Sequence, residues 1–411
     1  MTEPRYDVVV FGATGFTGRQ LAERLAQHRD RERFTFAIAG RNADKLASLR
    51  DALGGGIDVL LADASDPSSI RAMVRSARVV ASTAGPFALY SDAVVEACVE
   101  LGRHYTDITG ETPWVRTLID RHHDAAAAAG VRIVPMCGFD SVPSDLGAWM
   151  VVDFIRTELG QGTREVKGFH SMRGGGLNGG TLASALNMAE RGQRRAMGDP
   201  FLLDPESERR TEIRHGSRGQ REPRFDVDLG RWTAPFVMEP INTRVVRRSA
   251  ALSRAYGEPY GDDFSYRESL VVGSRTKATA LTLGFGLADA LLRTGSGRAL
   301  FRRLGPKPGE GPSERAMERG LTRLHLVGTA DDGTSVRCDM TIPGDAGNRA
   351  TVTLLSESAL ALALDGDSLP TQRGGLLTPA TAFGPVLVQR LRDAGVQISM
   401  RTSSPKRPSQ R

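Results

Sequence analysis

Three glycines spaced three residues apart, Gly12, Gly15 and Gly18, directly follow the apolar run 8–11. An apolar run of this kind is typical of a buried parallel strand. Gly12 permits a tight turn, Gly15 lets a pyrophosphate approach the backbone, and Gly18 lets the next helix pack closely. The positive end of a helix over 15–27 would face the phosphates. The pattern predicts a dinucleotide site, although a glycine-rich turn in an ordinary α/β domain has the same spacing.

A second apolar run, 34–39, ends in Gly40, Arg41 and Asn42. An NAD-selective site usually has Asp or Glu there, which accepts a hydrogen bond from the ribose 2′-hydroxyl. Arg41 instead offers a fork of donors for a 2′-phosphate, which favours NADP(H) unless Arg41 is a solvated surface residue. The predicted cofactor contacts are Gly12, Ala13, Thr14, Gly15, Phe16, Thr17, Gly18, Arg41, Asn42, Asp63, Thr83, Ala84, Gly85, Pro86 and Phe87.

Strand and helix patterns alternate up to about residue 147, which predicts an N-terminal Rossmann-like doubly wound parallel sheet. Further on, a hairpin signal at 331–334 lies between two strand-like segments, and a helical pattern follows over 348–363. We therefore expect a second α+β domain with a mainly antiparallel sheet. The expected units are 1–147 as the NADP-binding domain, 148–376 as the substrate or oligomerisation domain, 377–400 as a helix packing back on the first domain, and 401–411 as a disordered tail.

Two polar turns supply the candidate catalytic residues, Tyr105, Asp107, Asp140 and Ser141. Tyr105 is the first candidate proton donor because it lies near the end of a strand, but a packed aromatic with a satisfied hydroxyl is an equal alternative. Asp107 would tune the phenol or cap the next helix. Asp140 and Ser141 would position the ribose or carboxamide of the cofactor. Such groups suit hydride transfer coupled to proton donation.

Composition excludes several other classes. The formal charge is +6 over 411 residues and no basic stripe is interleaved with aromatics, so nucleic acid is not an expected partner. The three cysteines lie far apart, which favours a reduced, cytoplasmic protein. The seven histidines are not spaced as ligand pairs, apart from adjacent His122 and His123, so no metal site is expected.

The segment 278–292 is apolar except for Asp289, and basic residues follow it up to Lys307. It is too short to span a bilayer, which requires about 20 residues. Three interpretations are open: a buried helix or wall of an apolar substrate tunnel, peripheral membrane contact through 278–307, or a contact within a homo-oligomer.

Several further motifs complete a resemblance to a known family. They are VVFGATGFTG at 9–18, AGR at 39–41, TAGPF at 83–87, YTDITGE at 105–111, GFDSVPSDLG at 138–147, GGTLASALNMAE at 179–190, PGEGPSERAMERG at 308–320 and LTPATAFGP at 377–385. The chain resembles saccharopine dehydrogenase-like oxidoreductases, specifically the trans-acting enoyl reductase group. The resemblance implies an NADPH-binding domain and reduction of an enoyl thioester or related lipid intermediate presented by a polyketide synthase.

Other functions remain as alternatives at this stage. The absence of charge over 174–187 argues against a polyanionic amino-acid substrate, but a C=N or C=O reductase stays open. The short-chain dehydrogenase class needs a Lys four residues after a Tyr, and no tyrosine in this chain has one. A non-catalytic NADPH-binding sensor or lipid-surface adaptor is the remaining alternative.

Overall fold

The computed structural model describes residues 3–192, 196, 198–205, 219–307, 309–370 and 373–403. Within them the first sheet has the strand order β13-β6-β5-β4-β1-β2-β3, and all of its pairings are parallel. Its strands are β1 (Tyr6–Phe11), β2 (Phe36–Gly40), β3 (Asp58–Leu61), β4 (Ala77–Ser82), β5 (His104–Asp107), β6 (Arg132–Val134) and β13 (Gly375–Leu376). The helices that accompany β1–β6 are α1 (Phe16–Ala26), α2 (Ala43–Ala52), α3 (Pro67–Ser76), α4 (Phe87–Tyr90), α5 (Asp92–Leu101) and α6 (Thr112–Ala128).

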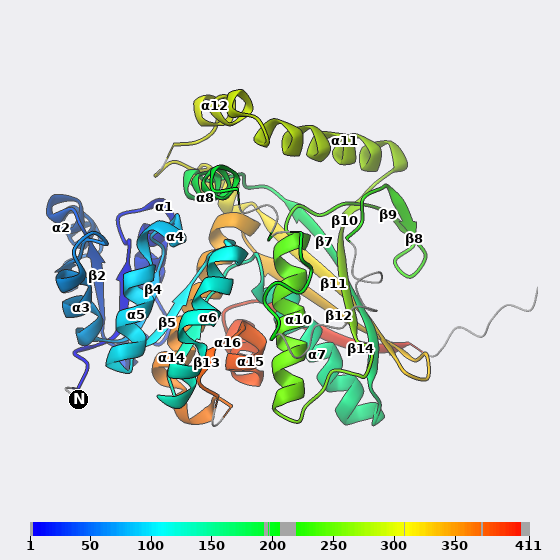
Figure 1. Ribbon diagram of the computed structural model, residues 1–411, viewed down its shortest axis with the longest axis horizontal. Coiled ribbons are helices and arrows are strands. Elements are labelled where there is room, and N and C mark those ends of the chain that lie inside the picture. Colours follow the sequence, from blue (N-terminus) through cyan, green and yellow to red (C-terminus); the bar gives the residue numbers. More distant parts are fainter. Residues whose placement is uncertain are drawn as a thin grey trace, which may run out of the picture.

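The central strand β1 is buried on both faces, which explains its continuous apolar sequence. Val8 and Val10 belong to one hydrophobic core, while Val9 and Phe11 belong to another on the opposite face. This alternation is the pleat of a strand covered by helices on both sides. Figure 1 shows this sheet at the left of the molecule, with the second sheet at the right.

The second sheet has the order β14-β12-β11-β7-β10-β9-β8 and is antiparallel except for the β7–β10 pair. Its strands are β7 (Thr163–Arg173), β8 (Arg224–Asp226), β9 (Arg231–Ala234), β10 (Ser265–Val272), β11 (Leu321–Ala330), β12 (Ser335–Pro343) and β14 (Gln397–Ser403). The other helices up to β11 are α7 (Val142–Leu159), α8 (Gly179–Glu190), α10 (Glu239–Ala255), α11 (Arg275–Leu292), α12 (Gly295–Leu304) and α13 (Glu314–Glu318). Helices α7 and α10 pack on one face of this sheet. The two sheets confirm the predicted fold class.

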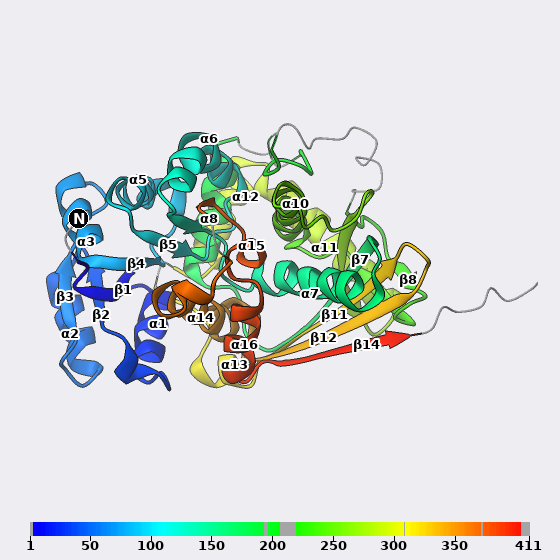
Figure 2. The same cartoon turned by 90° about the horizontal axis from the view of Figure 1, so that it is seen from below.

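The C-terminal part of the chain differs from the prediction of a single returning helix over 377–400. The chain already returns to the first sheet at α14 (Thr351–Leu364), which follows a π-helical turn at Ala346–Ala350 and contacts α1, β1, β4 and β5 (Figure 2). β13 then extends that sheet by pairing with β6.

The predicted last helix is two helices, α15 (Pro379–Phe383) and α16 (Pro385–Asp393). Gly384, at φ 50°, separates them, and the proline that follows starts the second helix. Residues 397–403 then form β14, the edge strand beside β12, because β12 offers an unpaired edge for it. The strand overlaps the start of the predicted tail 401–411, while residues 404–411 lie outside the described residues.

Candidate active site

The glycine turn between β1 and α1 has the shape of a phosphate cradle. Gly12 has φ 82°, and a Cβ there would lie 2.8 Å from the amide nitrogen of Ala84. A Cβ on Gly18 would lie 2.2 Å from the carbonyl oxygen of Gly12. Gly15 is the N-cap of α1 and makes no side-chain capping bond, whereas Asn42 caps α2 through the amide of Lys45. The first-turn amides of α1 therefore remain available for an anion, so these residues fit a dinucleotide.

A loop after β4 is fixed beside this turn. The hydroxyl oxygen of Thr83 lies 3.1 Å from the carbonyl oxygen of Phe11 and 3.2 Å from that of Gly12. At the other end of the loop, the buried carboxylate of Glu111 accepts a hydrogen bond of 2.8 Å from the amide of Phe87. The loop 83–87 is thus held at both ends along the edge where the cofactor is predicted to bind.

Arg41 and Asp63 lie at the ends of neighbouring strands but differ in their contacts. Arg41 is exposed, and its guanidinium makes no hydrogen bond or close ion pair with any described residue. Asp63 accepts hydrogen bonds from the amide and hydroxyl of Ser65, at 2.9 and 2.8 Å. These bonds, together with the charge of Arg41, hold the pKa of Asp63 below its usual range. Asp63 therefore orders its own turn, and Arg41 is free to meet a phosphate.

Tyr105 and Asp107 form a closed hydrogen-bonded pair inside the protein. Both are fully buried, and the phenol donates a 2.8 Å hydrogen bond to one oxygen of Asp107. The other oxygen accepts bonds from the amides of Thr109 and Met136, each at 2.9 Å. Burial raises the pKa of Tyr105 well above its ordinary value and that of Asp107 to about 7. This placement matches the alternative interpretation of Tyr105 as a packed aromatic with a satisfied hydroxyl.

Asp140 and Ser141 lie between β6 and α7, and their side chains, unlike those of Tyr105 and Asp107, have no hydrogen-bond partner among the described residues. The carboxylate of Asp140 is half-buried and accepts no hydrogen bond from any described residue, and burial raises its pKa to about 7. The Ser141 hydroxyl is buried without a hydrogen-bond partner among the described residues. A Cβ on Gly110 would lie 3.8 Å from Oδ2 of Asp140, so this carboxyl rests against the turn that follows β5. The carboxyl ends of parallel strands all lie at the same end of a sheet. Asp140, which follows β6, and the glycine turn, which follows β1, are therefore at the same end of the first sheet.

A buried polar cluster behind Asp140 was not predicted from the sequence. One carboxylate oxygen of Glu268 accepts hydrogen bonds from Ser144 at 2.8 Å and Tyr266 at 2.9 Å, and lies 2.9 Å from Nε2 of His170. Its second oxygen has no partner among the described residues, and neither has Nδ1 of His170. The ring of Phe139 packs edge-on against that histidine, at 5.8 Å between centroids, so the cluster adjoins the Asp140 turn.

The signal for this cluster was present but weak. Glu268 is a lone acidic residue near the apolar end of the β10 sequence SYRESLVV, where a buried strand normally excludes charge. Sequence patterns did not assign that strand, so the residue had no structural context.

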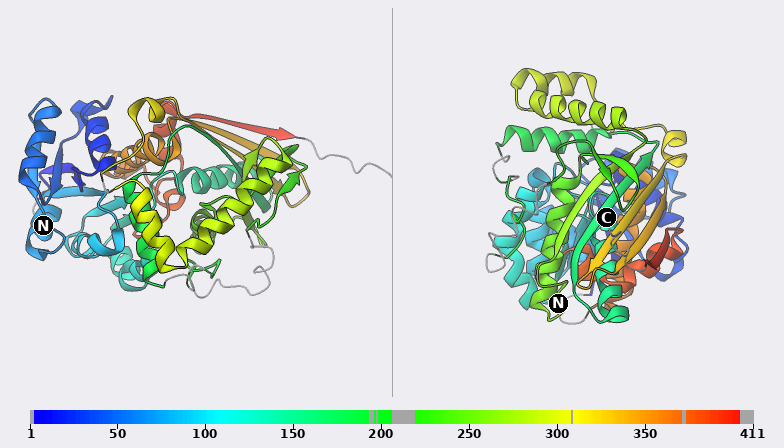
Figure 3. Two further views of the ribbon diagram at one scale, coloured as in Figure 1. Left: turned by 90° about the horizontal axis from the view of Figure 1, so that it is seen from above. Right: turned by 90° about the vertical axis from the view of Figure 1, so that its right-hand side faces the viewer.

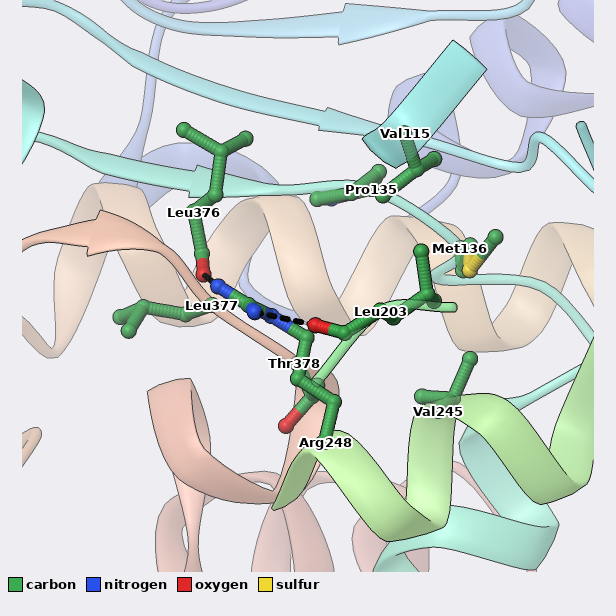
Figure 4. A pocket seen from close by; sticks show the side chains of 9 residues that line it. All are labelled: Val115, Pro135, Met136, Leu203, Val245, Arg248, Leu376, Leu377 and Thr378. Atoms are coloured by element: carbon green, nitrogen blue, oxygen red, sulfur yellow. Dashed lines mark hydrogen bonds between the residues drawn. The ribbon is translucent and has the colours of Figure 1, made fainter. Parts of the chain in front are cut away.

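A small cavity lies beside Arg248, where α6, α10 and the segments that follow β6 and β13 meet. It has a volume of about 10 Å³, which is room for about one water molecule. Figure 4 shows the guanidinium of Arg248 between two carbonyl groups, those of Leu203 and Leu376, each 2.6 Å from it. This buried arginine joins three segments that are distant in the sequence, and the cavity beside it is too small for a substrate.

These features define an NADP-binding oxidoreductase with a Rossmann-type sheet, and comparison with known proteins agrees. Residues 8–134 match the saccharopine dehydrogenase NADP binding domain. A Mycobacterium tuberculosis protein provisionally named a trans-acting enoyl reductase is 40% identical, over 97% of this chain and 98% of its own length. A Mycobacterium bovis protein named trans-acting enoyl reductase is 36% identical over 96% and 97%, respectively.

Saccharopine dehydrogenase from Saccharomyces cerevisiae has the same overall fold. It superposes with a TM-score of 0.53 at 12% identity and covers 97% of this chain and 99% of its own. The chain belongs to the trans-acting enoyl reductase family of saccharopine dehydrogenase-like proteins, and its cofactor is NADP(H), as the sequence predicts.

Proposed function

We propose that this protein uses NADPH to reduce the C=C bond of an α,β-unsaturated acyl thioester. The observation that carries the proposal is the carboxyl of Asp140, which has no described hydrogen-bond partner and lies on the edge of the sheet that bears the glycine turn. Bound NADPH supplies the hydride for the β-carbon of the substrate. Asp140 is protonated for part of the time at neutral pH, because of its raised pKa, and donates a proton to the α-carbon. Ser141 helps to hold the ribose or carboxamide of the cofactor.

The proposed substrate is a neutral acyl chain rather than a polyanion. Helix α8 borders the site through Ser184, whose hydroxyl donates a 2.8 Å hydrogen bond to Glu111. The stretch 174–187, which includes most of α8, carries no charged side chain. An uncharged wall favours an apolar ligand, since a carboxylate-rich substrate would need basic partners. Relatives are named as acting in trans, which supports an acyl thioester presented by a separate polyketide synthase.

The decisive experiment is single-turnover NADPH oxidation with a panel of 2-enoyl-CoA thioesters of increasing chain length. We expect Asp140→Asn to lower kcat by about 10²- to 10³-fold, as for loss of a general acid, with NADPH affinity unchanged. The matched control is Asp124→Asn, which changes an exposed carboxyl on α6 and should leave kcat unchanged. In the wild type, kcat/KM should fall as pH rises through about 7, because Asp140 loses its proton there, and this titration should vanish in Asp140→Asn.

The possible failures are distinguishable. If the wild type binds NADPH but reduces no enoyl thioester, the assignment to C=C reduction is overturned, and imines, ketones or a non-catalytic role become the candidates. If enoyl reduction proceeds and Asp140→Asn retains wild-type kcat, only the proton-donor assignment is wrong.

A further inference from the structure

Helices α11 and α12 extend from the β8–β10 end of the second sheet and lie outside the rest of the molecule (Figures 1 and 3). We call residues 275–307 the arm. Its first turn rests on β9, where Arg275 lies over the ring of Trp232 at 5.8 Å. Beyond that contact the arm is largely exposed, and Ala278 is the one buried residue of the fully described helix α11. The prediction that this apolar segment is a buried helix or a tunnel wall is therefore wrong, because the helix lies outside the core.

The exposed side chains of the arm include large aliphatic groups in pairs. Leu283 and Leu287 are one turn apart on α11 and are 69% and 63% exposed. Leu300 and Leu304 are one turn apart on α12 and are 45% and 75% exposed. Residues four apart lie on the same side of a helix, so each helix presents a leucine pair to solvent. Clustered aliphatic groups on a surface mark an interaction site.

The arm also carries the net positive charge of the chain. The whole chain has 54 Lys and Arg against 48 Asp and Glu, a difference of six. The arm holds seven basic residues against the single acidic residue Asp289, also a difference of six, so the remainder of the chain is electrically neutral. The basic residues are Arg275, Lys277, Arg293, Arg298, Arg302, Arg303 and Lys307. Exposed leucines flanked by basic residues suit the interface of an anionic bilayer.

The arm is joined to the candidate active site through α8. Glu190, at the end of α8, forms ion pairs with Arg298, at 3.9 Å, and with Arg302. The same helix carries Ser184, which bonds to Glu111 at the site. Helix α8 therefore lies between the arm and the site (Figure 1). An acyl chain that leaves a bilayer held by the arm would therefore pass α8 on its way to the site.

We propose that the arm docks on an anionic lipid bilayer, with its leucine pairs among the acyl chains and with basic residues that form no described ion pair, Arg303 and Lys307, at the headgroups. Docking is peripheral, because no described helix is both long and apolar enough to cross a membrane. A further consequence, which rests on the proposed function, is that an acyl substrate reaches the site past α8.

The experiment is cosedimentation of the full chain with phosphatidylcholine vesicles that contain or lack phosphatidylglycerol. We expect binding to the anionic vesicles that weakens as salt is raised. Leu283→Gln/Leu287→Gln should lower the vesicle affinity about tenfold or more, because two aliphatic groups no longer enter the bilayer. Arg303→Gln/Lys307→Gln should weaken binding to anionic vesicles alone. Leu61→Gln is the matched control, since Leu61 is 59% exposed on β3, and it should bind vesicles as the wild type does.

The vesicle assay uses neither substrate nor turnover, so its result is independent of the proposed reaction. NADPH binding by each variant in solution reports that the variant is folded. Failure of the folded wild type to bind either vesicle overturns the proposal, as does equal binding by the leucine variant. Self-association of the wild type in sedimentation velocity, lost in the leucine variant and without vesicle binding, would assign the surface to a second copy of the chain instead.

Discussion

Asp107 ends β5 and Asp140 lies in the turn after the neighbouring strand β6, and burial raises the pKa of each carboxyl group to about 7. Both oxygens of Asp107 accept hydrogen bonds from protein donors, whereas Asp140 accepts none from the described residues. Burial and a raised pKa therefore do not distinguish a structural carboxyl from a catalytic one. We expect unused hydrogen-bonding capacity to distinguish them, because a carboxyl without a protein partner can still form a hydrogen bond with a ligand.

The same contrast recurs after β2 and β3 of this sheet. Asp63 is bonded to Ser65 and orders its turn, while Arg41 lacks a bonded partner among the described residues. In both places the partnered side chain holds a loop, and we expect the unpartnered one to contact the ligand. Substitutions that separate stability from binding test whether this distinction is correct.

The largest loss of stability is expected for Asp107→Ala. Removing this carboxyl takes away the acceptor to which the phenol of Tyr105 and two backbone amides donate. Since a buried donor without a partner costs about 1–3 kcal/mol, the free energy of unfolding should fall by about 3 kcal/mol or more. Urea unfolding measures this, with Asp140→Ala as the matched control, which should lose less than about 1 kcal/mol. Equal losses in the two variants would refute the contrast between the turns.

The next effect is on coenzyme preference. Arg41→Ala should weaken NADPH binding by about 1.5–3 kcal/mol, or roughly 10- to 150-fold, because a charge-assisted bond to the 2′-phosphate is lost. Binding of NADH should be nearly unchanged. Titration calorimetry with both coenzymes tests this, and Lys45→Ala, an exposed cation on α2, controls for the general effect of charge. A similar weakening for both coenzymes would show that Arg41 does not bind the 2′-phosphate.

The smallest effect on stability is expected for Ser141→Ala. Its hydroxyl has no described partner, so the free energy of unfolding should change by less than about 1 kcal/mol, while NADPH affinity falls a few-fold. Ser249→Ala is the matched control, since its buried hydroxyl bonds to Asp145 and, at 2.6 Å, to Thr378. That control should lose about 1–2 kcal/mol in urea unfolding. A Ser141→Ala loss as large as that of the control would mean that Ser141 has a structural role.

Much of the first sheet was predictable because its signals are local. The glycine turn, the apolar run of β1 and the absence of an acidic residue after β2 lie within short segments, and they predicted the fold class and the NADP cofactor. The second sheet was predicted in character but not in detail. Strand β10 was not predicted, and the cluster around Glu268 was therefore not predicted either.

The C-terminal return was mispredicted for a related reason. The apolar residues of α14 are distributed around most of the helix, so its sequence does not indicate which sheet it covers. Only packing decided that it lies against β1, β4 and β5 rather than against the second sheet. The exposed arm likewise has the composition of a buried helix, and its position outside the core could not be read from its residues.

The sequence by itself determined the cofactor cradle, because a glycine at φ 82° and an uncapped helix start are properties of neighbouring residues. Tertiary structure alone decided which polar groups have partners. Asp107 meets the amide of Met136 across 29 residues, and Ser144 meets Glu268 across 124. Such contacts depend on how distant strands are brought together. Only the folded structure therefore reveals that the carboxyl of Asp140 has no hydrogen-bond partner among the described residues.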